Sequence, residues 1–252
     1  MRNDDNLFSL HGQTAMITGA GSGIGYSVAV ALAEAGADLV AASDRENLDD
    51  IRERAEKLGR TVHTAVFDVA DAQQTQSVVS AFAEDIDILV NNAGIIRRAP
   101  AERFTDGDWQ DVLEVNLSAA FRICRLIGPR MLRRGQGKII NIASLLAFQG
   151  GLNVASYAAS KHGLAGLTKA LANEWGEYNV QANAIAPGYI ITDTTKDLQD
   201  DGMRSQQILD RIPAGRWGRA DDIAGAAVFL ASRASDYVNG HLLVVDGGWL
   251  SR

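Results

Sequence analysis

Two side chains that can exchange a proton, Tyr157 and Lys161, stand four residues apart. Apolar residues recur at helical spacing over 156–175, so both side chains are expected on one helix face. A free tyrosine has a pKa of about 10, and an ammonium one turn away stabilises its phenolate. The pair therefore predicts a tyrosine general acid/base whose pKa is lowered by the lysine. An ordinary amphipathic pair on a surface helix is the alternative.

Two polar residues extend this set. Ser144 follows the apolar run 138–142 at the carboxyl end of a predicted strand, where its hydroxyl can polarise a carbonyl or orient an alcohol. Asn116 stands in the middle of a long predicted helix (109–131) and can bind a water that links Lys161 to solvent. Taken singly, Ser144 can be a strand-end cap and Asn116 a helix surface residue.

A glycine-rich segment, 18–25, follows the first predicted strand (15–18) and opens the first predicted helix (24–35). Glycines are needed where backbone turns sharply and approaches a pyrophosphate, whose charge the helix N-terminus binds. The strand before and the helix after make this pattern specific for a dinucleotide. A tight turn with close helix packing is the alternative. The residues assigned to the cofactor here are Gly19, Ser22, Gly23, Ile24 and Gly25.

The end of the second predicted strand (38–42) carries Asp44 and Arg45. A carboxylate at this place binds the ribose hydroxyls of NAD and repels a 2′-phosphate, whereas an arginine binds that phosphate. Asp44 comes first and favours NAD, while Arg45 leaves NADP open. Both can also be loop charges after a strand.

Two further strand ends complete the predicted cofactor site. Asp68 and Val69 follow the third strand (62–67) and can hold the adenine edge, although Asp68 alone is typical of a helix N-terminus. After the fourth strand (86–90), small residues let the cofactor lie across the sheet edge, where ligands of open α/β sheets bind. These residues are Asn92, Ala93 and Gly94.

The elements that position these residues alternate between strand and helix along the whole chain. Further strands are expected at 138–142, 180–185 and 242–245. Sustained alternation of apolar strands with helices predicts an α/β fold, a doubly wound parallel sheet in a single domain, residues 1–252. The interval 189–217 lacks a strand and is rich in Thr, Asp and Gly, so we expect a lid or binding loop there.

Composition narrows the class of protein. The 252 residues carry a net charge of -7, which indicates neither a nucleic acid nor an anionic membrane as partner. The lone Cys124 cannot form an internal disulfide, and the polar segment 1–10 has no run of signal-peptide length, so we expect a soluble cytoplasmic protein. The four histidines have no metal-ligand spacing, so no metal site is expected.

These motifs together resemble the classical short-chain dehydrogenases/reductases over nearly the whole chain. The matching motifs are Gly19-x-x-x-Gly23-x-Gly25, Asn91-Asn92-Ala93-Gly94, Asn116, Ser144, Tyr157-x-x-x-Lys161 and Pro187-Gly188. The resemblance implies a Rossmann fold with seven parallel strands, usually in a homotetramer. It implies Tyr157 as general acid/base, Ser144 as substrate anchor, Lys161 on the nicotinamide ribose and Asn116 in a proton relay. Contacts to the nicotinamide end would come from Pro187, Gly188, Ile190 and Thr192.

Four other stretches resemble a sugar-acid branch of that family, the 2-deoxy-D-gluconate 3-dehydrogenases, also described as 2-dehydro-3-deoxy-D-gluconate 5-dehydrogenases. They are 91–98, 148–151, 212–218 and 246–252. A sugar acid needs a cation for its carboxylate, so Arg97 joins Ser144, Gln149 and Tyr157 as a candidate substrate ligand. Arg98 directly follows it and Arg216 lies at the end of the expected lid, so which arginine binds stays open. Gluconate 5-dehydrogenases, other sugar/polyol reductases and 3-oxoacyl reductases remain alternatives, and a non-catalytic dinucleotide sensor is a different class.

Overall fold

Seven parallel strands form one sheet in the computed structural model, which describes residues 6–252. Part of the polar segment 1–10 lies outside the described residues. The strand order is β3-β2-β1-β4-β5-β6-β7, so the parallel α/β prediction is confirmed. The strands are β1 (Thr14–Thr18), β2 (Asp38–Ser43), β3 (Val62–Val66), β4 (Ile88–Asn91), β5 (Gly137–Ile142), β6 (Val180–Pro187) and β7 (Leu242–Val245).

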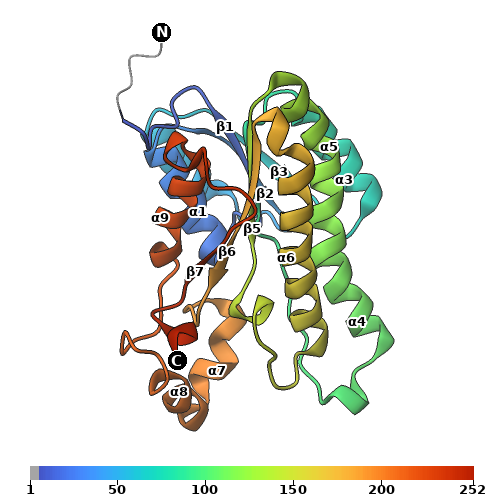
Figure 1. The fold of residues 1–252 in the computed structure, drawn as a ribbon, viewed down its shortest axis with the longest axis vertical. Helices are drawn as coiled ribbons and strands as arrows, with labels where there is room; N and C mark the ends of the chain where they lie inside the picture. The colour runs from blue at the N-terminus through green and yellow to red at the C-terminus, as the bar shows by residue number, and fades with distance from the viewer. Residues whose placement is uncertain (1–5) are drawn as a thin grey trace.

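Helices cover both faces of the sheet (Figure 1). One core lies between the strands and α1 (Gly23–Glu34), α2 (Asp49–Lys57) and α9 (Asp221–Ala231). The second core lies under α3 (Ala72–Phe82), α5 (Ala119–Arg134) and α6 (Ala155–Trp175). Each β6 residue is buried, because this strand lies inside the sheet with helices on both sides.

The sheet reverses its direction of growth next to β1. The chain moves outward from β1 to β2 and β3 and then returns to place β4 on the other side of β1. In open parallel sheets, the carboxyl ends of the strands at such a reversal frame a ligand crevice. The ends of β1 and β4 carry the glycine-rich turn and the Asn92–Gly94 segment, so the fold places both motifs at this crevice.

The predicted helix 109–131 is two helices joined by a π turn. α4 (Asp106–Leu113) begins earlier than predicted, since Thr105 Oγ1 accepts a hydrogen bond of 3.0 Å from the N–H of Asp108. The π turn, Glu114–Ser118, then leads into α5. A π turn inserts one residue without breaking the helical run, so apolar periodicity does not reveal it.

The composition of the segment 189–217 suggested a loop, but the segment is not a continuous loop. It contains two short helices, α7 (Lys196–Asp200) and α8 (Gly202–Leu209), and Asp201 caps α8. Its two ends are joined by a parallel bridge, in which Ile191 N–H donates to the carbonyl of Gly218 at 2.9 Å. The segment is therefore a closed excursion from the end of β6, at the lower end of Figure 1 near the C-terminus.

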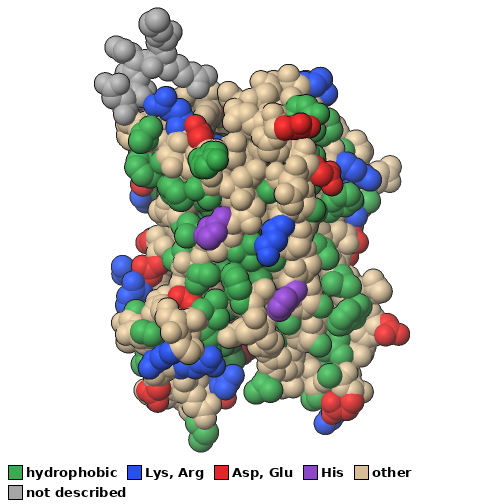
Figure 2. All heavy atoms as spheres, in the orientation of Figure 1, with side chains coloured by type: hydrophobic (Ala, Val, Ile, Leu, Met, Phe, Trp, Pro, Cys, Tyr) green, Lys and Arg blue, Asp and Glu red, His purple; other side chains and the backbone are tan. Residues whose placement is uncertain are grey.

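The surface mixes charge and apolar groups. Basic, acidic and hydrophobic side chains are interspersed over the face in Figure 2 rather than gathered into one area of a single sign. Among residues 6–252, no helix is both long and apolar enough to cross a membrane.

Candidate active site

A cleft of about 920 Å³ opens at the carboxyl ends of the strands. The cofactor residues predicted from the sequence line it, with the exception of Gly25. From the predicted reacting set it collects Ser144, Tyr157 and Lys161. Residues that the sequence analysis did not assign also line it: Thr18, Gly21, Ala42, Ser43, Asn47, Phe67, Ile95, Val115, Ile142, Ala143, Ile191, Asp193, Thr194, Thr195, Lys196, Gln199 and Asp200.

The glycine-rich turn is shaped by two different demands on its glycines. Gly19 has a φ of +67°, a conformation that favours glycine. A Cβ on Gly25 would lie 2.1 Å from the carbonyl oxygen of Gly19. Gly25 therefore lets α1 pack against the turn, which is why it does not face the cleft.

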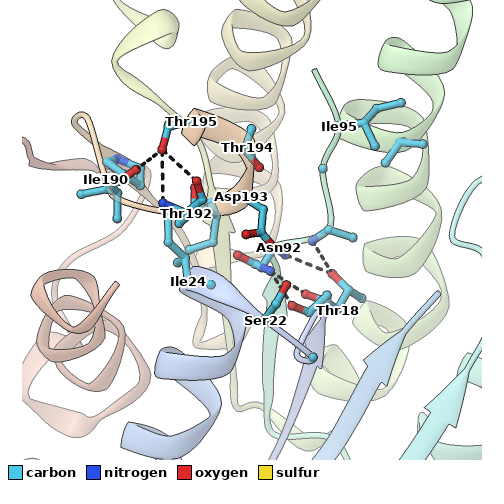
Figure 3. A pocket seen from close by; sticks show the side chains of 18 of the residues that line it. Thr18, Ser22, Ile24, Asn92, Ile95, Ile190, Thr192, Asp193, Thr194 and Thr195 are labelled. Atoms are coloured by element: carbon cyan, nitrogen blue, oxygen red, sulfur yellow. Dashed lines mark hydrogen bonds between the residues drawn. The ribbon is translucent and has the colours of Figure 1, made fainter. Parts of the chain in front are cut away.

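The ends of β1 and β4 are tied together by side chains (Figure 3). Thr18 Oγ1 accepts hydrogen bonds of 3.0 Å from the N–H groups of Asn92 and Ala93. Asn92 Nδ2 donates in return to the carbonyls of Thr18, at 2.9 Å, and Gly19, at 3.1 Å. These four bonds fix the floor of the cleft, so Asn92 acts through the backbone of the turn.

A dinucleotide fits the residues at this end of the cleft. Ser22, at the N-cap of α1, makes no side-chain capping bond to the helix, so the N–H groups of the first turn remain available to a phosphate. The glycine-rich turn keeps side chains away from these groups. The bound group would be held by this turn, Asp44 or Arg45, and Lys161.

At the adenosine end, Asp44 and Arg45 are both largely exposed and their charged groups lie 3.8 Å apart. Asn47 also lies here, although no feature of the sequence pointed to it. Its Oδ1 accepts a hydrogen bond of 2.8 Å from Ser43 Oγ, and a Cβ on Gly21 would lie 2.3 Å from its side chain. Asn47 thus covers the turn at the place where Gly21 leaves room for it.

Tyr157 and Lys161 face each other one turn apart on α6. Lys161 Nζ lies 5.5 Å from the centre of the Tyr157 ring and donates a 2.6 Å hydrogen bond to the carbonyl of Ile142 at the end of β5. Ser144 comes two residues after that strand, and its hydroxyl hydrogen-bonds to Tyr157. β5 and α6 therefore bring the serine, tyrosine and lysine together, as the sequence predicted.

The electrostatics of the pair differ from the sequence-based expectation. Burial raises the pKa of Tyr157, while the Ser144 hydrogen bond and the positive charge of Arg98 lower it. Burial also lowers the pKa of Lys161 to about 8. In the protein alone, the lysine therefore gives up its own proton before the phenolate forms. The groups that oppose the rise in the tyrosine pKa are Ser144 and Arg98.

Asn116 lies in the π turn, 2% exposed, and does not line the cleft. Its Oδ1 accepts from Ile95 N–H at 2.8 Å, and its Nδ2 donates to the Ile95 carbonyl at 2.9 Å and to Ser160 Oγ at 3.2 Å. Its amide is therefore engaged by protein groups, and it shares with Lys161 the wall of a small cavity of about 10 Å³.

Two predicted substrate ligands do not reach the cleft. Arg97 pairs with Asp108, with a 3.4 Å distance between Nε and Oδ1, and Gln149 Oε1 accepts a 3.3 Å hydrogen bond from the indole of Trp249. Arg216 forms a bidentate pair with Asp222, in which Nη1 donates to Oδ2 at 2.7 Å and Nη2 donates to Oδ1 at 2.8 Å. This pair lowers the pKa of the Asp222 carboxyl to about 2.

Arg98 is exposed and does not line the cleft either, but its positive charge lowers the pKa of Tyr157. Its Nη2 donates at 3.3 Å to the carbonyl of Thr194, in the segment 189–217. Which of the two adjacent arginines, Arg97 or Arg98, can bind a substrate depends on the direction of its side chain, and the sequence does not determine that direction.

The first part of the segment 189–217 forms one wall of the cleft. Thr195 Oγ1 donates to the carbonyls of Ile190, at 2.6 Å, and Thr192, at 3.0 Å (Figure 3). The Thr192 methyl group also lies over Gly23 at the start of α1, where a Cβ would be 3.4 Å away. This wall therefore spans the glycine-rich turn. No cluster of three or more candidate metal ligands occurs within residues 6–252.

Comparison with known proteins agrees with this geometry. A family model described as enoyl-(acyl carrier protein) reductase matches residues 19–250. The chain is 56% identical to the 2-dehydro-3-deoxy-D-gluconate 5-dehydrogenase of Bacillus subtilis (strain 168), over 98% of each chain.

Two solved structures extend the match to the fold. A Beutenbergia cavernae protein with bound NADP is 48% identical, with a TM-score of 0.96 over 98% of this chain and 100% of that chain. The gluconate 5-dehydrogenase of Burkholderia cenocepacia, in complex with NADP and tartrate, is 44% identical, with a TM-score of 0.93 over 98% of each chain. The chain belongs to the short-chain dehydrogenases/reductases.

Proposed function

We propose that this chain is an NAD(P)-dependent dehydrogenase that interconverts the C5 alcohol and ketone of 2-dehydro-3-deoxy-D-gluconate. The observation that carries the proposal is a dinucleotide cleft whose lining brings Ser144, Tyr157 and Lys161 together. The 56% identity to the Bacillus subtilis enzyme supports the choice of substrate.

The chain's own groups supply proton transfer and orientation. In the oxidation direction, the Tyr157 phenolate removes the proton of the substrate hydroxyl, and in the reduction direction the phenol returns it to the carbonyl oxygen. Ser144 donates to the same oxygen and holds it against the tyrosine. Lys161, fixed by the Ile142 carbonyl at 2.6 Å, holds the nicotinamide ribose. The nicotinamide, when bound, accepts or supplies the hydride.

Arg98 binds the substrate carboxylate in this proposal. It is the cation whose charge reaches Tyr157, whereas Arg97 and Arg216 are paired with Asp108 and Asp222. An arginine binds a carboxylate with two parallel hydrogen bonds, which also orients the acid. Arg98 therefore replaces Arg97 as the proposed substrate ligand.

The cofactor is proposed to be NAD, with NADP also accepted. Asp44, which lines the cleft, can bind the ribose hydroxyls, and the exposed Arg45 guanidinium beside it can hold a 2′-phosphate. The NADP bound to the two related structures supports this second ability.

The remaining expectations concern assembly and location. We propose a homotetramer that acts in the cytoplasm, in keeping with the family resemblance and with the single buried cysteine. Light scattering that shows a monomer would contradict the assembly.

A substrate panel tests the proposed function. Initial rates of the purified protein are measured with 2-dehydro-3-deoxy-D-gluconate, gluconate, a sugar alcohol and a 3-hydroxyacyl thioester, each with NAD and NADP. We expect the largest kcat/KM with the deoxy keto acid. A larger value with gluconate would favour a gluconate 5-dehydrogenase. Dinucleotide binding without turnover of any alcohol would favour a sensor.

A further inference from the structure

The C-terminal segment 246–252 lies between the segment 189–217 and the loop that begins at Ser144. Trp249, in its middle, is 4% exposed and packs with Leu145, Ile208 and Ile212. Its indole Nε1 donates a hydrogen bond of 3.3 Å to Gln149 Oε1. One buried ring therefore connects the chain terminus to the loop that carries the substrate-orienting serine.

The indole is held in place from several sides. The Tyr189 ring lies 4.7 Å from it, and the Arg211 guanidinium lies 4.1 Å from the ring centre, within range of a cation–π interaction. The Asp246 carboxylate accepts bonds of 2.8 Å from the N–H groups of Gly248 and Leu250, so the backbone on either side is also fixed. The direction of the indole N–H is thus set by packing.

An indole nitrogen is a donor only, and this dictates the orientation of its partner. A glutamine amide carries one oxygen acceptor and one NH₂ group with two donors. If the Gln149 amide were flipped, its NH₂ would face the indole N–H, donor against donor. Trp249 therefore holds the Gln149 oxygen, and the NH₂ group makes no hydrogen bond to any of the residues 6–252.

The loop from Ser144 leads toward this free NH₂ group. Ser144 Oγ accepts a hydrogen bond of 3.2 Å from Leu146 N–H, and Gln149 N–H donates at 3.3 Å to the Leu145 carbonyl, so the loop is one compact turn. A six-carbon sugar acid held at one carbon by Ser144 and Tyr157 carries further oxygens beyond that contact. Gln149 is on the same loop as Ser144 and offers a free donor for one of them.

We propose that Trp249 is a positioning residue that fixes the Gln149 amide as a hydrogen-bond donor to an oxygen of the sugar-acid substrate. Gln149 is then a binding residue selective for acceptor oxygens, such as those of a carboxylate or carbonyl. This inference rests on the proposed function, because it names part of the substrate site.

The test is a double-mutant cycle on KM. Trp249→Phe keeps an aromatic ring against Tyr189 and Arg211 but removes the N–H, and Gln149→Met removes the amide at similar length. Since one hydrogen bond contributes about 1 kcal/mol, we expect each single change to raise the KM for 2-dehydro-3-deoxy-D-gluconate about five-fold. The double variant should be no worse than Gln149→Met, and kcat and the KM for NAD should change little.

Two further variants separate orientation from packing. Trp217→Phe removes an indole of the same aromatic cluster that donates no hydrogen bond to residues 6–252, and it should leave the substrate KM unchanged. Gln149→Glu can still accept from Trp249 but presents an oxygen where the NH₂ stood, so it should raise the KM more than Gln149→Met.

The possible outcomes are distinct. Additive effects of Trp249→Phe and Gln149→Met, or an unchanged KM in Trp249→Phe, would overturn the inference while the proposed function stands. A wild-type protein that binds NADH but turns over no sugar acid would refute the proposed function, and with it the ligand assigned to Gln149.

Discussion

Lys161→Met is expected to stabilise the cofactor-free protein at neutral pH while it removes activity. The Lys161 ammonium is 4% exposed, and burial lowers its pKa from 10.5 to about 8. That difference corresponds to a cost of about 3 kcal/mol for keeping the charge in the folded state at pH 7. Methionine has a similar helix propensity, and the lost charge-assisted bond from the ammonium to the Ile142 carbonyl costs about 2 kcal/mol. The net gain in unfolding free energy is about 1 kcal/mol.

The sign of the pH dependence follows from the lowered pKa. Below pH 8 the folded protein holds a proton that burial disfavours, and between pH 8 and 10.5 the folded form releases it before the unfolded form does. The wild type therefore gains stability from this group as pH rises through that window. At pH 9.5 the cost of the charge falls to about 1 kcal/mol, and the bond of the neutral amine to the Ile142 carbonyl contributes about as much, so the net advantage of Lys161→Met shrinks to about zero.

Urea denaturation at pH 7 and pH 9.5, at one fixed protein concentration, measures both values. Lys169→Met, an exposed lysine on the same helix, is the matched control and should change stability by less than about 0.5 kcal/mol at either pH. A Lys161→Met protein that is less stable than the wild type at pH 7, or whose advantage grows with pH, would refute the reasoning.

Three further predictions concern substrate and cofactor. Arg98→Met should raise the substrate KM at least about ten-fold, because a charge-assisted hydrogen bond contributes about 1.5–3 kcal/mol, while Arg97→Met should leave it nearly unchanged; equal effects in steady-state kinetics would contradict the assignment. Arg45→Ala should raise the KM for NADP and spare that for NAD, and a matched rise for both would refute the role of the guanidinium. Thr18→Val should destabilise the protein by about 1–3 kcal/mol and weaken NADH binding, because the N–H groups of Asn92 and Ala93 lose their acceptor. Thermal melts and NADH titrations measure the two effects. Thr64→Val, at an exposed strand position, is the control and should change neither stability nor NADH binding.

Local pattern was enough to predict the sheet and the cofactor end of the cleft. Apolar runs separated by helical periodicity predict a parallel sheet, and such a sheet collects the carboxyl ends of its strands at one edge. Residues that follow strands within one or two positions, such as Asp44, Asn92 and Ser144, were therefore expected at the cleft without any knowledge of side-chain direction, and they line it.

Features that depend on side-chain direction were not predictable in this way. Arg97 and Arg98 are adjacent in sequence, yet Arg97 pairs with Asp108, whereas the charge of Arg98 lowers the pKa of Tyr157. Gln149 lies in the loop after Ser144, but its bond to Trp249 joins residues 100 positions apart. The π turn at Asn116 was hidden because it leaves the apolar periodicity of the flanking helices intact.

The prediction that Lys161 lowers the pKa of Tyr157 was also wrong, for a physical reason. Spacing places the lysine near the tyrosine, but it does not report burial, and burial opposes both charged forms. In the folded protein, the groups that lower the pKa of Tyr157 against burial are Ser144 and Arg98, which lie outside the helix that carries Tyr157.

The most direct measurement is the turnover of Tyr157→Phe with 2-dehydro-3-deoxy-D-gluconate and NAD, followed as NADH formation beside the wild type. Removing a general acid/base should lower kcat by about 10²–10⁴-fold, while NADH binding, measured by fluorescence, stays close to that of the wild type. A Tyr157→Phe protein that retains full turnover would contradict the proposed mechanism.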